Sequence, residues 1–74
     1  MKNRIVIDLH RVRHHKVAQM IDSQIAKHIQ APYNATIITG RSKEMQTIVV
    51  SALEQMGFVK SDMIMFPHKI EISW

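Results

Sequence analysis

The chain has 74 residues, of which 46% are hydrophobic, and contains two Gly, two Pro and no Cys. This length fits one small domain spanning residues 1–74 and excludes a second core, because an average domain has about 100–150 residues. The lack of Cys excludes disulfides, thiolate zinc sites and cysteine nucleophiles. No apolar run approaches the roughly 20 residues that span a bilayer, so we expect a cytoplasmic protein with no membrane partner. Ten Lys and Arg against six Asp and Glu give a net charge of +4, which favours a polyanionic partner.

The first half of the chain predicts a strand, a helix and a second strand. Alternating apolar residues indicate a strand over residues 5–9. From about His14 to Gln30 the apolar residues recur at helical spacing. The stripe that they form comprises Val17, Met20, Ile21, Ile25, His28 and Ile29. Pro32 cannot continue the helix, and the β-branched residues 35–39 predict a second strand that ends at Gly40.

The second half predicts another helix and two short strands. An amphipathic pattern begins at Ser42 or Lys43 and ends at Met56. Its apolar stripe comprises Met45, Ile48, Val49, Ala52, Leu53 and Met56. We expect Ser42 to cap the helix and Gly57 to follow it with a positive φ. Residues 63–66 and 69–74 predict two strands with a tight connection between them.

The predicted order of elements is βαβαββ. Right-handed crossovers between parallel strands put both helices on the same face of a sheet. The alternation of apolar and polar residues in the first and last strands fits a sheet that is covered on one face only. We therefore expect an α/β (α+β) two-layer sandwich, with a four-stranded mixed sheet, both helices on one face and the other face open. The expected core comprises Ile5, Ile7, Leu9, Val17, Ile21, Ile25, Ile48, Val49, Leu53, Ile70 and Ile72.

Basic and small polar residues follow the first two predicted strands. The carboxyl ends of parallel strands meet at one edge of a sheet, where ligands of open α/β sheets bind. Two helix N-termini at that edge add free N–H groups, so phosphate is the expected ligand. The candidate nucleic-acid-binding residues are Arg11, Arg13, His14, His15, Lys16, Thr39, Gly40, Arg41, Ser42 and Lys43. The alternative, that these residues are solvated loop positions and a helix cap, stays open.

Two short motifs stand at the ends of these strands, namely Asp8, Leu9, His10 and Arg11, and Thr39, Gly40, Arg41 and Ser42. They resemble the D-L-H-G motif and the H-G-x-G or T-G-x-G motif of the small MutS-related (Smr) domain family. Length, element order and motif separation agree over essentially the whole chain. The resemblance implies a fold like the C-terminal domain of bacterial translation initiation factor three, with strand order 1-2-4-3 and an antiparallel fourth strand. It also implies nucleic-acid binding and, in many members, nicking or cleavage of DNA or RNA.

Two positions depart from the family motifs. Arg11 stands where the first motif has glycine, and Ser42 stands where the second motif has its second glycine. We expect phosphate binding to survive both replacements. Cleavage demands close backbone geometry, so we expect any cleavage to be weak.

Asp8 and His10 are the candidate catalytic residues, and they match the Asp and His of the first motif. Because they are two residues apart on the predicted strand, their side chains would project from the same face and reach one phosphodiester. Asp8 could orient a water or a divalent ion, and His10 could act as general acid or base. Their structural alternatives, a turn cap and a backbone hydrogen bond, stay open. We expect no zinc site at His10 and His14, and Mg²⁺ or Mn²⁺ only as a weakly held ion if the domain cleaves.

The remaining aromatic and histidine residues carry no functional prediction. Tyr33, Phe58 and Trp74 are few and widely spaced in the sequence, so they do not predict a platform for stacking bases. His28 and His68 are expected to lie away from the candidate site.

Three functions are therefore open at this point. The first is a nucleic-acid-binding domain that nicks or cleaves, and the second is a binding module of the same fold without catalysis. The third is a protein-interaction domain that docks on a ribosome or a repair protein through the open sheet face. The two replaced glycines favour the second function over the first.

Overall fold

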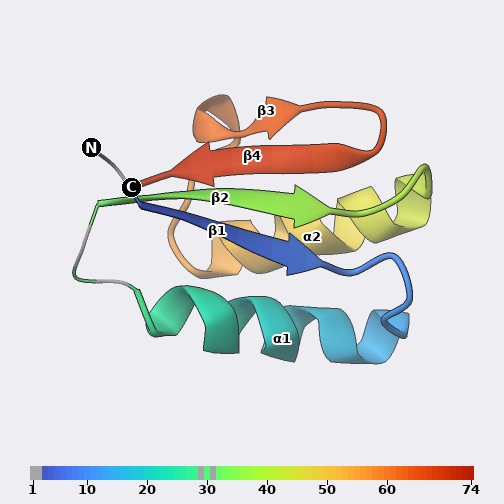
Figure 1. Cartoon of the computed structure of the whole chain (residues 1–74). Coiled ribbons are helices and arrows are strands. Elements are labelled where there is room, and N and C mark those ends of the chain that lie inside the picture. Colours follow the sequence, from blue (N-terminus) through green and yellow to red (C-terminus); the bar gives the residue numbers. More distant parts are fainter. Residues whose placement is uncertain (1–2, 29, 31) are drawn as a thin grey trace.

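The computed structural model describes residues 3–28, 30 and 32–74. It shows an α+β fold with a four-stranded mixed sheet and two helices, which confirms the expected class. Figure 1 shows the elements in chain order: β1 (Asn3–Asp8), α1 (His14–Ala26), β2 (Tyr33–Ile38), α2 (Lys43–Gln55), the 3₁₀ turn η1 (Lys60–Asp62), β3 (Ile64–Met65) and β4 (Lys69–Ser73).

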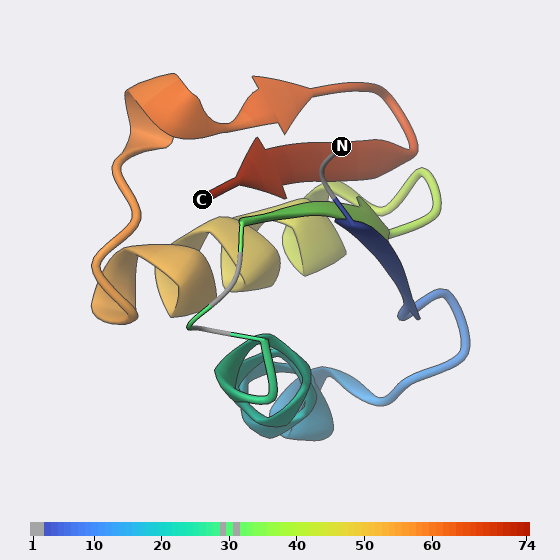
Figure 2. The ribbon, with the colours of Figure 1, turned by 60° about the vertical axis from the view of Figure 1, so that its left-hand side comes forward.

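The strands lie in the order β1-β2-β4-β3. β1 is parallel to β2, whereas β4 is antiparallel to both β2 and β3. Figures 1 and 2 show α1 and α2 on the same side of the sheet. Within the described residues no element covers the opposite face, which we call the open face. The carboxyl ends of β1 and β2 lie together at one edge, because their register pairs Asp8 with Ile38.

The core lies between the sheet and the two helices. Its buried hydrophobic residues are Ile7, Leu9, Val17, Ile21, Ile25, Ala35, Ile37, Met45, Val49, Ala52, Leu53, Met63, Ile70 and Ile72. Ile5 and Ile48, which the sequence also assigns to the core, are half-buried at its margin. Ile29 of the predicted first stripe lies outside the described residues.

Helix boundaries follow the capping residues. The Ser42 hydroxyl accepts a hydrogen bond from Met45 N at 3.1 Å, and Gly57 has a φ of 102°, so both predicted caps of α2 are confirmed. The first helix ends earlier than expected, at Ala26 rather than near Gln30. His28 N then bonds the carbonyl of Ile25 in a tighter turn, which takes the chain out of the α-helix.

The strands also differ from their predicted bounds. β1 ends at Asp8, and β2 runs from Tyr33 to Ile38 instead of covering residues 35–39. β3 has two residues instead of four. Its start is lost because Met63 N bonds the carbonyl of Lys60 in η1. At its other end, the bond from Phe66 N to the carbonyl of Lys69, the first residue of β4, closes the hairpin.

Three aromatic residues and His28 meet at the end of the sheet opposite the ends of β1 and β2. The rings of Tyr33 and Trp74 stack at 6.0 Å between centroids, and Phe58 packs edge-on against Trp74 at 5.8 Å. The Trp74 indole N–H donates to the His28 carbonyl at 3.1 Å. These residues meet although they are widely spaced in the sequence, because the antiparallel β4 returns the end of the chain to the start of β2. All four side chains are half-buried, so the cluster closes the core.

Among the described residues, neither helix is long and apolar enough to cross a membrane.

Candidate nucleic-acid interface

The candidate site is formed by the loops that follow β1 and β2, residues 9–13 and 39–42. Leu9 N donates to the Ile38 carbonyl at 2.8 Å, so the parallel pairing continues into the first loop. Gly40 has a φ of 66°, and a Cβ placed on it would lie 3.7 Å from the Cβ of His10. The two loops therefore lie side by side, and we call the surface that they form the phosphate edge.

At the phosphate edge, one carboxylate oxygen of Asp8 contacts both the backbone and the side chain of His10. Asp8 Oδ1 accepts a hydrogen bond from the backbone N–H of His10 at 3.1 Å and also contacts His10 Nδ1. The hydrogen bond to the His10 side chain, followed by the bond to its backbone, lowers the pKa of the Asp8 carboxyl below 3.8. Each side chain is about half exposed, at 48% for His10 and 51% for Asp8, so a ligand can reach both.

The placement of His10 corrects one sequence expectation. His10 lies in a turn beyond the end of β1, not on the strand with Asp8. The chain bends there because the Asp8 carboxylate caps the backbone N–H of His10. The turn brings the two side chains into direct contact, which alternation along a strand does not by itself produce.

This contact prepares the imidazole of His10 for proton transfer. When the Nδ1 proton is donated to the Asp8 carboxylate, the lone pair of Nε2 is free to accept a proton from a ligand. The same nitrogen can then return that proton to a leaving group. The pair can therefore serve as general base and general acid without a metal ion.

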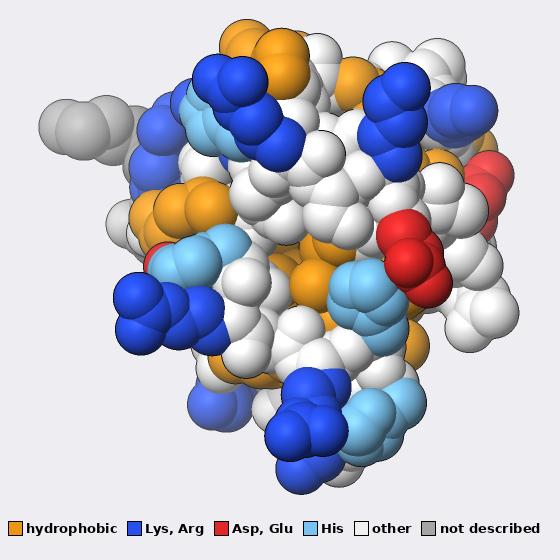
Figure 3. Space-filling model, turned by 90° about the vertical axis from the view of Figure 1, so that its right-hand side faces the viewer, with side chains coloured by type: hydrophobic (Ala, Val, Ile, Leu, Met, Phe, Trp, Pro, Cys, Tyr) orange, Lys and Arg blue, Asp and Glu red, His pale blue; other side chains and the backbone are white. Residues whose placement is uncertain are grey.

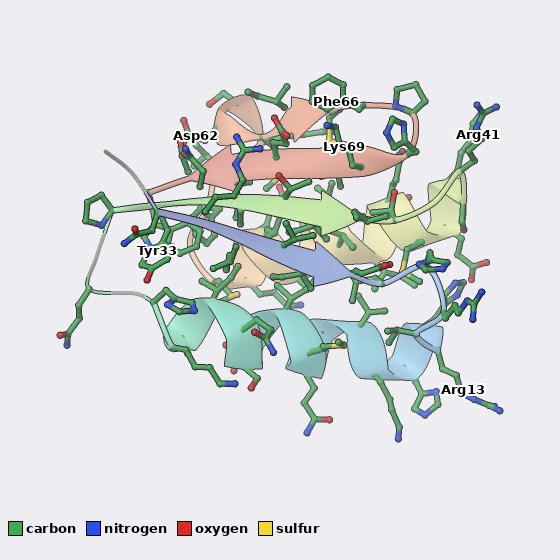
Figure 4. All side chains as sticks on the ribbon, in the orientation of Figure 1. Arg13, Tyr33, Arg41, Asp62, Phe66 and Lys69 are labelled. Carbon is green, nitrogen blue, oxygen red and sulfur yellow. The ribbon has the colours of Figure 1, made fainter. Side chains whose placement is uncertain are left out.

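The two loops and the starts of the helices that follow them carry five exposed cationic side chains: Arg11, Arg13, Lys16, Arg41 and Lys43. Figure 3 faces this end of the molecule and shows Lys, Arg and His side chains spread across it, with few acidic groups. In Figure 4 Arg13 and Arg41 extend outward at this same end from the two loops. A surface with this excess of positive charge attracts phosphate groups.

The two helix N-termini at the edge differ. α1 begins after Arg13 with no side-chain cap, so N–H groups of its first turn are available to a phosphate oxygen. α2 is capped by Ser42, whose hydroxyl oxygen already accepts from Met45 N, although its O–H can still donate. Glu44 in the first turn of α2 also lies 3.4 Å from His14 Nδ1. Because His14 is the first residue of α1, Glu44 lies beside both helix N-termini, and the uncapped N–H groups of α1 are the feature that favours an anion on that side.

A shallow hollow of about 610 Å³ continues from the first loop along α1. It is lined by Arg11, Val12, Arg13, Lys16, Gln19, Met20, Ser23 and Gln24. This lining combines three cations with uncharged donors and contains no carboxylate. The smaller hollow along α2, of about 400 Å³, includes Glu54. Gln19, Ser23 and Gln24 are not among the predicted site residues, although their helical spacing from Lys16 places them on the same side of α1.

Thr39 stabilises the second loop from inside and is not part of the exposed surface. Its side chain is buried, and its hydroxyl donates to the Gly40 carbonyl at 2.8 Å. Although Thr39 was predicted to contact nucleic acid, the structure places it where it fixes the conformation of Gly40.

The connection between β3 and β4 reaches the same edge. Thr39 N donates to the His68 carbonyl at 3.0 Å, and the Gln46 side-chain amide donates to the carbonyls of Phe66 and Pro67 at 2.9 and 3.1 Å. The expectation that His68 lies away from the site is therefore wrong, because the antiparallel β4 begins where β1 and β2 end. His28, by contrast, lies at the opposite end of the sheet in the aromatic cluster.

In the described part of the chain, no three His, Cys, Asp or Glu side chains gather closely enough to hold a metal ion. No family model, no curated protein and no solved structure matches this chain.

Proposed function

We propose that this chain is an Smr-like domain that binds nucleic acid through the phosphate edge. The observation that carries the proposal is the hydrogen bond from Leu9 N to the Ile38 carbonyl, which continues the parallel pairing and sets the two loops side by side. That pairing brings five exposed cations, the Asp8–His10 pair and an uncapped helix N-terminus to one edge of the molecule. The strand order β1-β2-β4-β3 supports the proposal, because it is the order implied by the resemblance to the Smr family and to the C-terminal domain of translation initiation factor three.

The bound strand extends along α1 rather than α2. The hollow beside α1 has cations at its mouth and half-buried Val12 and Met20 among its lining, so it offers charge for a phosphate and apolar surface for a base or sugar. The carboxylate of Glu54 lines the hollow beside α2, whereas no carboxylate lines the hollow beside α1.

Salt dependence tests the binding proposal. Fluorescence anisotropy would be measured with labelled single-stranded RNA and DNA and with duplexes of the same sequence, over a series of salt concentrations. If all five cations contact phosphates of a single strand, log K falls against log salt with a slope of about −0.7 per contact, or about −3.5 in total. A slope near zero, or no binding at low salt, would refute the proposal.

The contact between Asp8 and His10 favours phosphodiester cleavage as a second function of the same edge. On RNA, His10 Nε2 takes the proton of a 2′-hydroxyl, whose oxygen attacks the adjacent phosphorus. The bond from phosphorus to the 5′-oxygen breaks, and the imidazolium returns the proton to that oxygen. The products are a 2′,3′-cyclic phosphate and a 5′-hydroxyl, and the cationic residues stabilise the charge that develops on phosphorus.

Cleavage is tested with labelled structured RNA and supercoiled DNA, in EDTA and with added Mg²⁺ or Mn²⁺. This mechanism predicts weak RNA cleavage that persists in EDTA and yields cyclic phosphate ends. Activity that requires a metal ion would assign the chemistry to a bound cation instead. No cleavage of any substrate would leave the binding function alone.

A further inference from the structure

The open face of the sheet carries exposed apolar groups on its two outer strands. Val6 on β1 is 61% exposed, and Ile64 on β3 is 57% exposed. Between these strands the face is hollowed by about 230 Å³. Figure 2 shows that the helices lie on the other side of the sheet, so they do not cover these side chains.

The strand register arranges this face in rows that cross the sheet. One row comprises Val6, Thr36, Glu71 and Ile64, because each is paired with the next. The neighbouring row begins with Arg4 and continues through Asn34 and Ser73. Asp62, the last residue of η1, lines the same hollow as Arg4, Asn34 and Ser73, so it lies beside this second row on the β3 side.

These rows are self-complementary. A twofold axis parallel to the strands, lying between two facing sheets, places β1 of one copy over β3 of the other. Val6 then meets Ile64 of the second copy, and Arg4 meets its Asp62. Each of these contacts occurs twice, as required at an isologous interface.

We propose that the open face binds a second copy of this chain in this face-to-face arrangement. Aligned sheets pack about 10 Å apart with their strands about 30° from parallel, a spacing that lets side chains from both faces interdigitate. The central polar groups are already partnered within one copy. Thr36 Oγ1 donates to Glu71 Oε2 at 3.3 Å, and Lys69 Nζ lies 3.4 Å from the same oxygen. Docking therefore buries no unpaired charge at the centre of the interface.

The dimer is expected to be weak. A standard interface covers about 800 Å² per partner, roughly a sixth of the 5007 Å² accessible surface of this chain. Four short strands offer less than this, so we expect a dissociation constant on the order of 100 μM.

Sedimentation equilibrium tests the proposal, with concentrations from about 1 μM to about 1 mM around the expected dissociation constant. Arg4→Asp and Asp62→Arg each place like charges opposite one another, and each should weaken the dimer by about tenfold or more. The double variant Arg4→Asp/Asp62→Arg restores opposite charges and should regain most of the affinity between copies.

Two matched control variants distinguish an effect at the open face from an effect of the overall charge. Lys60→Asp and Asp22→Arg make the same changes in charge at exposed positions, and neither residue lines the hollow of the open face. They should leave the dimer within about twofold, since rim and distant charges act weakly. A chain that stays monomeric throughout the series, controls that weaken the dimer as much as the test variants, or a double variant that does not recover would overturn the proposal. Circular dichroism of every variant checks that each is folded.

Discussion

At the scale of single residues, the Asp8 oxygen that contacts both the backbone and the side chain of His10 determines the pKa of the Asp8 carboxyl. Because hydrogen bonds from His10 lower the pKa of Asp8, its carboxyl should titrate below 3.8, and any stability that it contributes should be lost only as pH falls through that lowered value. In His10→Ala the pKa should rise, but incompletely, since the backbone N–H of residue 10 still donates. NMR titration of the Asp8 carboxyl carbon measures both values, and an unchanged pKa in the variant would contradict the side-chain contact.

We expect cleavage to require the His10 side chain and binding not to require it. A proton-transfer group typically contributes about 10²–10⁴-fold to the rate, whereas the five cations are expected to hold the ligand without it. His10→Ala should therefore abolish RNA cleavage and leave affinity within a few-fold. Arg11→Gly should raise cleavage if a small residue there lets the phosphate backbone approach. Equal cleavage by His10→Ala and the parent would place the activity elsewhere.

Arg41 should contribute affinity without sequence preference. It lies on the second loop at the phosphate edge and extends outward in Figure 4, so its replacement should remove about one phosphate contact. Arg41→Ala should then weaken binding to all sequences alike and make the salt slope shallower by about 0.7. Lys60→Ala, on the hollow beside α2, removes the same charge and serves as the control. Equal losses from both variants would show that net charge, rather than the phosphate edge, determines binding.

How far single residues can be predicted depends on whether their partners are local. Ser42 and Gly57 follow from local rules for helix ends, and the structure shows both as caps. Thr39 and His68 meet through a hydrogen bond between distant segments. The burial of Thr39 and the position of His68 beside it were therefore not readable from the sequence alone.

At the scale of elements, α2 stabilises the fold mainly through its apolar stripe. Leu53 is fully buried between α2 and the sheet, so Leu53→Ala removes apolar contacts and leaves a cavity. Such a replacement costs about 2–5 kcal/mol, a large share of the stability of a small domain. Urea denaturation measures the change, and Ser51→Ala on the exposed side of the same helix is the control. A loss below about 1 kcal/mol for Leu53→Ala would contradict the assigned core.

The distinction between local and distant partners also explains which elements the sequence predicts well. Helix α2 has a complete apolar stripe and both caps within its own segment, so its bounds are predicted to within one residue. The length of β3 depends instead on η1 and on the turn to β4. Met63 N bonds the carbonyl of Lys60 in η1, so pairing with β4 begins only at Ile64. Such competition for backbone hydrogen bonds leaves no periodic signal in an apolar run.

At the scale of the whole molecule, topology sets which surfaces coexist. The antiparallel β4 carries the connection after β3 to the phosphate edge and returns Trp74 to Tyr33 at the other end. One end of the sheet is therefore closed by aromatic side chains, while the other keeps its cations exposed. The alternating strands predict an open face, but the opposition of Arg4 and Asp62 across it depends on a strand register that the sequence pattern does not specify.

The proposed dimer predicts how a long nucleic-acid strand is bound. A twofold axis parallel to the strands leaves both phosphate edges pointing in the same direction, so one long strand can contact both copies and bind more tightly than either site alone. Asp62→Arg makes the chain more positive, which by charge alone should strengthen binding. Because the variant also disrupts the open face, it should instead weaken binding to a long strand at dimer-forming concentrations, while binding to a short strand is unchanged or stronger.

Asp22→Arg is the matched control for this reversal, because it adds the same charge on the exposed side of α1. It should strengthen binding to long and short strands alike. Anisotropy with two strand lengths at a protein concentration near the dimer dissociation constant measures the difference. If Asp62→Arg and Asp22→Arg strengthen long-strand binding equally, the two phosphate edges do not act together, and each copy binds nucleic acid independently.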